Sequence, residues 1–292
     1  MYPNCKLLAL GICSPNETFA KNRNNAMIEL NTPVEIEVMA EGGRKLAEVL
    51  HALEAEAKVG VTTKQLDRVA YQMIHKLGAK PAFLHYRPSG AAHAYPYTLC
   101  ASLNDVVVHG QPSDYALASG DLIKLDLGLI YKGLYLDAAI TVLVGDAAHA
   151  GEKKSPAIRE ARKLIAATEE ALAAGIAEAR PGNTIGDIGA AIEAVVRRNK
   201  FSVAEGLIGH GIGRSLHEDP AVFNFGRRGT GEPLEEGMVI AIEPMVVASA
   251  AKNGGAIVTR KDDSYATRDG SPAAHFEHTI AITARGPRVL TE

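Results

Sequence analysis

The sequence predicts a single α+β domain made of two similar halves. Three observations lead to this prediction: a helical segment recurs 122 residues apart, β-rich segments follow each copy, and each half places two acidic residues at matching strand positions. Such internal similarity is typical of a duplicated unit whose copies share one core. We therefore expect pseudo-symmetry, with a functional site where the halves meet.

The first repeated element is a pair of helices. Residues Glu48–Thr62 and Glu170–Thr184 are identical at eight of fifteen positions when the chain is shifted by 122 residues. In each copy an Ala-, Leu- and Glu-rich helix is followed by a glycine that can end it, and then by a threonine that can cap the next helix. The apolar periodicity predicts the second helices over residues 64–77 and 185–200.

Two strand segments recur as well. Gly120–Asp126 and Gly237–Glu243 both run from a glycine through a β-branched alternation to an acid six positions later. Leu136–Thr141 and Phe276–Thr283 both place one acid ahead of a β-rich run. Each half therefore contributes two carboxylates at strand positions.

The first two carboxylates, Asp126 and Asp137, are expected to face each other in an antiparallel hairpin. A four-residue loop over Ile130–Gly133 would pair Leu129 with Leu134 and Asp126 with Asp137. Facing side chains have Cβ atoms about 4.5–5.5 Å apart. Two partly buried carboxylates at that distance repel unless a shared proton or a cation neutralises them. Two ordinary aspartates at a solvated edge are an equal alternative for this pair alone.

The second half adds Glu243, which ends the strand expected over residues 238–242, and Glu277, which begins the strand over residues 277–282. Either one alone is more often a surface acid than a ligand. Four acids related by duplication favour a metal site. His210 lies between two glycines in GHGIGRSLHEDP, a stretch that matches neither G-x-G-x-x-G nor H-E-x-x-H. Its uncrowded ring suits a ligand, and a structural histidine is the alternative.

Composition excludes several other functions. The formal net charge of the 292 residues is −3 without a Lys/Arg block, so no nucleic-acid surface is expected. No apolar run approaches the roughly 20 residues of a membrane span. Three cysteines without a C-x-x-C pair, and a weak signal-like stretch at Lys6–Cys13 without a cleavage site, favour the cytoplasm. Residues 1–26 are polar. They are expected to be either a flexible extension or a segment upstream of a true start at Met27.

Five motifs together resemble those of type I methionine aminopeptidases, which are pita-bread metallopeptidases. The resemblance runs from about Thr32 to Leu290 and implies an N-terminal extension over residues 1–31 and one catalytic domain over residues 32–292. It also implies the pita-bread fold, in which duplicated helix pairs related by a pseudo-two-fold pack on a curved antiparallel sheet. The motifs are NDVVVHG (Asn104–Gly110), KLDLGLIYKGLYLD (Lys124–Asp137), GHGIGRSLHEDP (Gly209–Pro220), AIEPMV (Ala241–Val246) and FEHTI (Phe276–Ile280).

The resemblance implies a centre of two divalent metal ions. Asp126 would bind one ion, His210 and Glu243 the other, and Asp137 and Glu277 would bridge them. Two ions would also quench the carboxylate repulsion expected from the strands. Oxygen ligands with one imidazole suit Co, Mn, Fe or Zn.

The resemblance also implies the reaction, hydrolytic removal of the initiator methionine from nascent proteins and peptides with a small second residue. Glu243 would carry a proton from the attacking water to the leaving amine. His109 and His217 would contact the scissile peptide and stabilise the tetrahedral intermediate. The substrates would be nascent N-termini near the ribosome, and the enzyme is expected to be a monomer.

A methionine pocket is expected beside this centre. Tyr95, Cys100 and Leu216 match pocket positions of the family, with Leu216 where an aromatic is common, and Phe83 and Tyr265 are weaker candidates. The sequence departs from the family's pattern beside the pocket at Arg87–His93 and Lys261–Pro272. The remaining histidines are interpreted as structural: His51, His75, His85, His93, His149, His275 and His278. Among them, His278 is a candidate to support its neighbour Glu277.

Two other functions stay open. An aminopeptidase P or prolidase would cut before proline on the same fold, but such enzymes usually carry a further N-terminal domain and only about 30 residues precede the match. A relative that binds peptide ends or ribosomes without cleaving them would not need all five ligand positions and both histidines.

Overall fold

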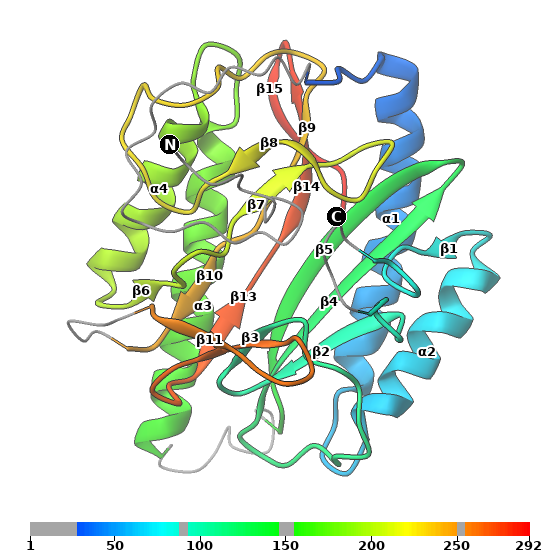
Figure 1. The fold of residues 1–292 in the computed structure, drawn as a ribbon, viewed down its shortest axis with the longest axis vertical. Helices are drawn as coiled ribbons and strands as arrows, with labels where there is room; N and C mark the ends of the chain where they lie inside the picture. Colours follow the sequence, from blue (N-terminus) through cyan, green and yellow to red (C-terminus); the bar gives the residue numbers. More distant parts are fainter. Residues whose placement is uncertain (1–27, 88–92, 146–154, 250–254) are drawn as a thin grey trace.

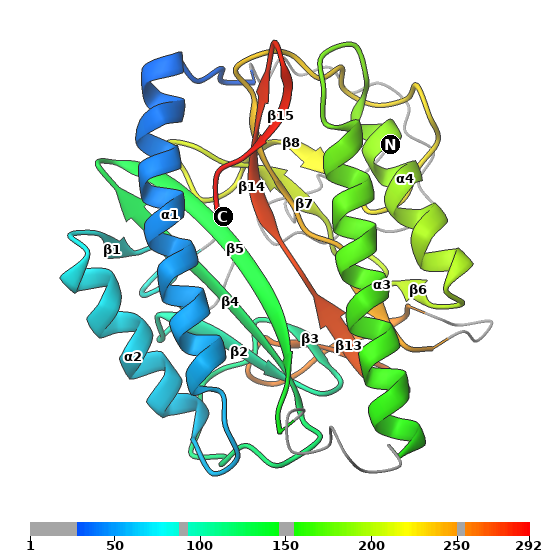
Figure 2. The same ribbon diagram turned by 180° about the vertical axis from the view of Figure 1, so that it is seen from behind.

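Four helices lie on one side of a set of antiparallel strands in the computed structural model, which describes residues 28–87, 93–145, 155–249 and 255–292 (Figures 1 and 2). The helices are α1 (Pro33–Glu56), α2 (Thr63–Lys76), α3 (Pro156–Glu178) and α4 (Ile185–Arg198). The strands are β1 (Lys80–Pro81), β2 (Leu99–Leu103), β3 (Val106–Val108), β4 (Leu122–Tyr131), β5 (Leu134–Leu143), β6 (Ser202–Val203), β7 (Gly209–Gly211), β8 (Glu218–Val222), β9 (Val239–Ile242), β10 (Met245–Val247), β11 (Ile257–Thr259), β12 (Tyr265–Thr267), β13 (Ala273–His275), β14 (His278–Thr283) and β15 (Gly286–Val289). This arrangement confirms the predicted α+β class.

The duplicated helix pair is confirmed in detail. Gly60 and Gly182 end the turns after α1 and α3 with nearly equal φ angles of 89° and 93°. Thr62 and Thr184 then cap α2 and α4 at their N-termini. The predicted second helices agree with α2 and α4 to within two residues at every end. Glycine at the two turns is explained by the left-handed backbone, which other residues adopt only with strain.

The hairpin of β4 and β5 has a different register from the one expected. Its loop is the two-residue turn Lys132–Gly133, whose φ angles of 50° and 88° are those of a type I′ turn. Asp126 therefore pairs with Ala139, and Asp137 pairs with Gly128, so the expected direct pairing of the two aspartates is wrong by two residues. Because side chains alternate with a period of two, both carboxylates stay on the same face as diagonal neighbours.

The two halves meet where β5 runs beside β14, and threonine hydroxyls replace part of the backbone ladder there. The Thr279 hydroxyl accepts from the Asp137 N–H (3.0 Å) and donates to the Asp137 carbonyl oxygen (2.8 Å). The Thr141 hydroxyl makes the same two bonds with the backbone of His275 (2.9 and 2.7 Å). Between them, the Glu277 N–H donates directly to the backbone of β5 (2.9 Å). We call this contact the threonine seam; it fixes the backbone beneath several candidate site residues.

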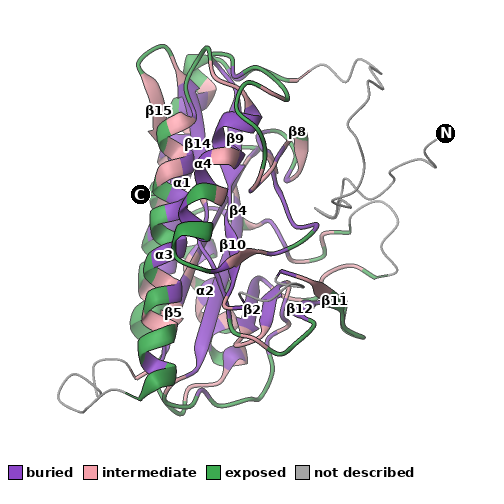
Figure 3. Ribbon diagram, turned by 90° about the vertical axis from the view of Figure 1, so that its left-hand side faces the viewer, coloured by how far each residue is buried: buried purple, intermediate pink, exposed green. Residues whose placement is uncertain are grey.

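Each half packs its helices over its own apolar cluster. One cluster joins α1 and α2 to β4 and β5, with Leu46 and Leu125 fully buried. The other joins α3 and α4 to β9 and β14, with Ile192 and Ile280 fully buried. Figure 3 shows the exposed residues of the helices turned away from the strands and the buried residues facing them. The helices of each half thus have an apolar cluster of their own, although some strand residues of each half pack into the cluster of the other.

Replacing Thr279 with Val is expected to lower the free energy of unfolding by about 2 kcal/mol or more. The substitution keeps the shape of the side chain but leaves the buried N–H and C=O of Asp137 without partners, and each orphaned group costs about 1–3 kcal/mol. Chemical denaturation measures the change. The control is Thr259→Val on the exposed side of β11, which should stay within about 0.5 kcal/mol of the parent. Equal stability of both variants would contradict the role given to the seam.

Candidate metal centre

One cavity of about 900 Å³ lies between the two halves. Its wall includes every residue that the sequence proposed for the site: Tyr95, Cys100, His109, Asp126, Asp137, His210, Leu216, His217, Glu243 and Glu277. The first half contributes two of the acids from β4 and β5. The second half contributes His210 from β7, Glu243 directly after β9 and Glu277 directly before β14. Residues from distant parts of the chain therefore converge on a single space.

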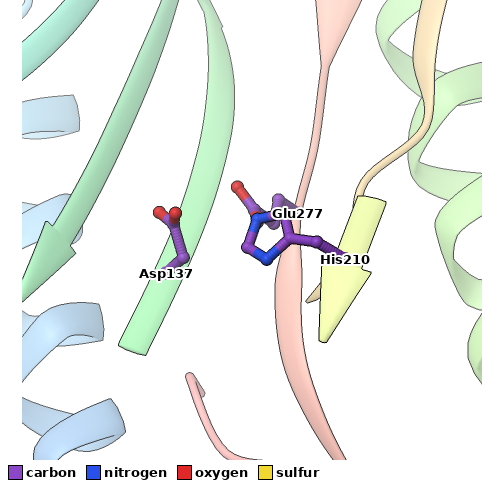
Figure 4. Close-up of side chains that lie close together, drawn as sticks. All are labelled: Asp137, His210 and Glu277. Carbon is purple, nitrogen blue, oxygen red and sulfur yellow. The ribbon is translucent and has the colours of Figure 1, made fainter. Parts of the chain in front are cut away.

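One group of possible ligands is Asp137, His210 and Glu277. One ligand atom from each lies within 4.8 Å of the other two, and Figure 4 shows the three side chains turned toward the same space. Glu243 adjoins this group, since its Oε1 lies 3.6 Å from His210 Nε2. Asp126 reaches it as the diagonal neighbour of Asp137 across the hairpin.

His210 is held with one ring nitrogen turned toward the acids. Its Nδ1 lies 2.9 Å from the Gly211 carbonyl oxygen. A carbonyl oxygen only accepts, so we assign the proton to Nδ1, which leaves the Nε2 lone pair facing Glu243. Metal-binding histidines are oriented in this way, by a hydrogen bond from the nitrogen that does not bind the ion.

The glycines around His210 are explained by close packing of strands. A Cβ atom on Gly209 would come within 2.3 Å of the Ala241 carbonyl oxygen, and one on Gly211 within 2.2 Å of the Asp219 carbonyl oxygen. The short strand β7 therefore fits between β8 and β9 only with glycine at these two positions. This packing places the single side chain between them, His210, at the cavity.

The four carboxyl groups are buried, and burial is the largest cause of their raised pKa values. It raises the pKa of Asp126 and of Glu243 to about 7, and it raises the pKa of Asp137 and of Glu277 well above the ordinary range. The other carboxylates add repulsion for Asp137 and Glu277. Asp126 Oδ1, Asp137 Oδ1 and Glu277 Oε1 have no hydrogen-bond partner within the described ranges. Unpaired carboxylate oxygens beside an imidazole nitrogen form a donor set that fits divalent ions.

His217 is oriented by a residue that the sequence did not identify. The Tyr86 hydroxyl lies 2.7 Å from His217 Nδ1. Burial raises the pKa of Tyr86, so the phenol keeps its proton, and burial lowers the pKa of His217, so the ring is neutral. The phenol therefore donates to Nδ1, and the His217 proton lies on Nε2. Tyr86 was missed because it adjoins the segment Arg87–His93, where the sequence departs from the family's pattern.

His109 is the second neutral histidine of the cavity. Burial lowers its pKa to about 4. Its φ of 60° is unusual for a residue other than glycine, and such strained backbone is enriched at functional sites. Its ring lies edge-on to Tyr265, with centroids 5.5 Å apart. At neutral pH His109 can therefore donate or accept a hydrogen bond without carrying charge.

An apolar wall adjoins the centre. Tyr95, Cys100 and Leu216, together with the weaker candidates Phe83 and Tyr265, all line the cavity. The Tyr95 hydroxyl lies 3.0 Å from each of two backbone carbonyl oxygens, which fixes its ring in the wall. Of the two departing segments, residues 88–92 lie outside the described residues. The segment Lys261–Pro272 contributes β12 and part of the cavity rim.

His275 lies in the same cluster, although the sequence interpretation placed it among the structural histidines. Its Nε2 is 3.3 Å from Glu243 Oε2 and 3.9 Å from Glu277 Oε2. Its position two residues before Glu277 was a usable signal, because alternate residues of an extended segment point to the same face.

Known proteins resemble this chain in sequence and in fold. Residues 37–284 match metallopeptidase family M24. The methionine aminopeptidase of Clostridium perfringens is 41% identical over 267 residues, which cover 91% of this chain and 99% of that protein. The crystal structure of the methionine aminopeptidase from Rickettsia prowazekii has a TM-score of 0.82 and 34% identity, and the match covers 91% of this chain and 100% of that one. The prolidase from Pyrococcus furiosus, with 22% identity, a TM-score of 0.66 and 65% of its chain covered, shares the fold alone.

The raised pKa values predict that divalent ions bind more tightly as the pH rises through about 7. Carboxyl groups must lose their protons to bind an ion, and Asp126 and Glu243 hold theirs up to about pH 7. Affinity for Mn²⁺ should therefore fall as the pH is lowered from 8 to 6. Calorimetry at pH 6.5 in two buffers with different ionisation enthalpies should detect at least one proton released per chain. Ordinary carboxyl groups, with pKa values near 4, would release none.

Proposed function

The chain belongs to metallopeptidase family M24, and we propose that it is a methionine aminopeptidase that removes the N-terminal methionine from nascent proteins and peptides with a small second residue. The observation that carries the proposal is the single cavity in which buried carboxylates, oriented histidines and an apolar wall adjoin one another. The likeness to a methionine aminopeptidase over nearly all of that protein supports the same conclusion.

We propose that two divalent ions, drawn from Co, Mn, Fe or Zn, bind in this cavity. Asp126 would hold one ion, His210 and Glu243 the other, with Asp137 and Glu277 shared. The unpaired oxygens of the buried acids and the inward Nε2 of His210 support this assignment. Divalent ions at such a site supply Lewis acidity, which lowers the pKa of water toward neutrality and polarises a peptide carbonyl.

Glu243 would move the proton of the reaction. General acid–base catalysis needs a group that can take up and release a proton beside the reacting atoms. Glu243 lies at the cavity wall beside His210, among the residues that would hold the ions. Its carboxylate can take a proton from the attacking water and return it to the amine that leaves.

His109 and His217 would bind the scissile peptide. Both rings are neutral because burial lowers their pKa values, and both line the cavity. With Tyr86 bound to Nδ1, His217 offers its Nε2–H to an oxygen of the substrate. A fixed donor of this kind stabilises the negative charge that develops on the carbonyl oxygen as the tetrahedral intermediate forms.

Specificity would come from two parts of the cavity wall, one apolar and one acidic. Tyr95, Cys100 and Leu216 offer apolar contacts to an unbranched thioether side chain. The carboxylates beside them attract the free α-amino group that only the first residue of a chain carries. A substrate bound by both groups places its first peptide bond at the histidines, which accounts for removal of a single residue.

The cellular setting is also a proposal. We expect a cytoplasmic monomer that meets nascent N-termini near the ribosome, without binding nucleic acid itself. The net charge of −3 and the absence of a Lys/Arg block in the sequence support the last of these, the lack of nucleic-acid binding. In the described ranges, no helix has the length and apolar character to cross a membrane.

Purified protein supplied with Co²⁺ or Mn²⁺ is expected to release methionine from Met-Ala-Ser, to lose this activity with a chelator, and to cleave Xaa-Pro-Pro poorly. Amino-acid release measured by chromatography checks all three results. Preference for Xaa-Pro-Pro would favour the aminopeptidase P alternative. Hydrolysis of neither peptide with any divalent ion would favour a binding protein.

Replacing Tyr86 with Phe is expected to lower kcat/KM about three- to tenfold, the effect of one lost hydrogen bond. Without the phenol, His217 can carry its proton on either nitrogen. Nitrogen NMR of the histidine rings should show a mixture of tautomers in the variant and a single one in the parent. The control is Tyr71→Phe on the exposed side of α2, which should change neither measurement. An unchanged His217 tautomer in Tyr86→Phe would contradict the positioning role.

A further inference from the structure

We propose that His275 is a metal ligand of this centre, which would then carry two imidazoles instead of the single one that the resemblance implies. The inference rests on the proposed function for the presence of ions. It concerns a side chain of β13 that lies outside the ligand set assigned above.

The His275 ring is buried without a hydrogen-bond partner among the described residues. His275 is 1% exposed, and neither Nδ1 nor Nε2 has a hydrogen-bond partner among the residues that the structure describes. A neutral imidazole has one N–H and one lone pair, and leaving buried polar atoms without partners is costly. A structural histidine would use at least one of them within the protein. An ion at Nε2 supplies the missing partner for that nitrogen.

Two carboxylate oxygens lie close to the His275 ring. His275 Nε2 lies 3.3 Å from Glu243 Oε2 and 3.9 Å from Glu277 Oε2, and the three residues form a group whose ligand atoms all lie within 4.8 Å. Nε2 is near both oxygens but makes a hydrogen bond to neither. Two donor atoms bound at about 2.0–2.2 Å to one ion lie roughly 3.0–3.5 Å apart. The 3.3 Å distance to Glu243 lies in this range and the 3.9 Å distance to Glu277 is slightly longer, so the spacing suits Glu243 and His275 as ligands of a common cation.

The two carboxylate oxygens of Glu243 face two different imidazoles. Its Oε1 faces His210 Nε2 at 3.6 Å, and its Oε2 faces His275 Nε2 at 3.3 Å. Glu277 likewise belongs to both groups, one with Asp137 and His210 and the other with Glu243 and His275. With His275 as a ligand, Glu243 would be shared between the ions in addition to Asp137 and Glu277, and each ion would have one imidazole.

The threonine seam fixes the position of this ligand. The His275 N–H and carbonyl oxygen both bond to the Thr141 hydroxyl, so the backbone cannot turn the ring away from Glu243 and Glu277 without breaking two buried hydrogen bonds. A second imidazole should also shift metal preference, because imidazole suits Zn, Fe and Ni while carboxylate and water suit Mn and Mg. His275 would thus favour Zn²⁺ over Mn²⁺.

The test is proton NMR of the full chain loaded with two equivalents of Co²⁺. Each ligating histidine gives one strongly shifted, solvent-exchangeable N–H signal, so the parent protein should show two. His275→Gln should show one, and competition titrations should show its preference for Zn²⁺ over Mn²⁺ reduced at least about tenfold. The control is His278→Gln, which changes the neighbouring histidine whose Nδ1 instead bonds Thr291. It should keep two signals and the parent preference.

A single shifted signal in the parent protein would overturn the proposal, even if His275→Gln failed to fold. Two signals that both persist in His275→Gln would overturn it as well, because another histidine would then supply the second. The proposed function fails differently. A protein that binds no ion and cleaves no Met-Ala-Ser contradicts both proposals, whereas cleavage with one imidazole signal contradicts this one alone.

Discussion

The structure depends on the crowding of four buried carboxyl groups on the wall of one cavity. Burial is the main cause that raises the pKa of Asp126 and Glu243 to about 7, and burial together with the neighbouring acids raises the pKa values of Asp137 and Glu277 well above the ordinary range. Such a group is stable only when protons or cations balance the charge. The strand positions, the glycines around β7 and the meeting of the halves all maintain this crowding.

The histidines around the acids differ in the hydrogen-bond partner of the ring nitrogen Nδ1. A backbone carbonyl fixes His210, so that its lone pair faces the acids, while a phenol fixes His217, so that its N–H faces the cavity. His275 has no such partner among the described residues. Identical side chains can therefore play different chemical roles within one cavity, and the partner of the second nitrogen decides which role each plays.

The class of the fold, the duplicated helices and the faces of the two aspartates could be predicted from the sequence, because helix caps and strand alternation are local properties. The hairpin register could not, since it depended on whether Lys132 would accept a positive φ. Tyr86 and His275 were missed for a related reason. Tyr86 contacts His217 and His275 lies beside Glu243, in each case across a long stretch of sequence, so the packing of strands reveals these neighbours. For His275, its position two residues before Glu277 was a further signal.

The position of the proposed ions between the two halves has a consequence for the lifetime of the protein. Asp126 and Asp137 belong to one half, and His210, Glu243 and Glu277 to the other, so ions held by both sets would fasten the halves together as a removable cross-link. A ligand present at a hundred times its dissociation constant stabilises the folded state by about 2.7 kcal/mol. Loss of the ions would then lower the stability of the folded state and make the chain more susceptible to proteases, which would couple the abundance of the protein to the supply of ions.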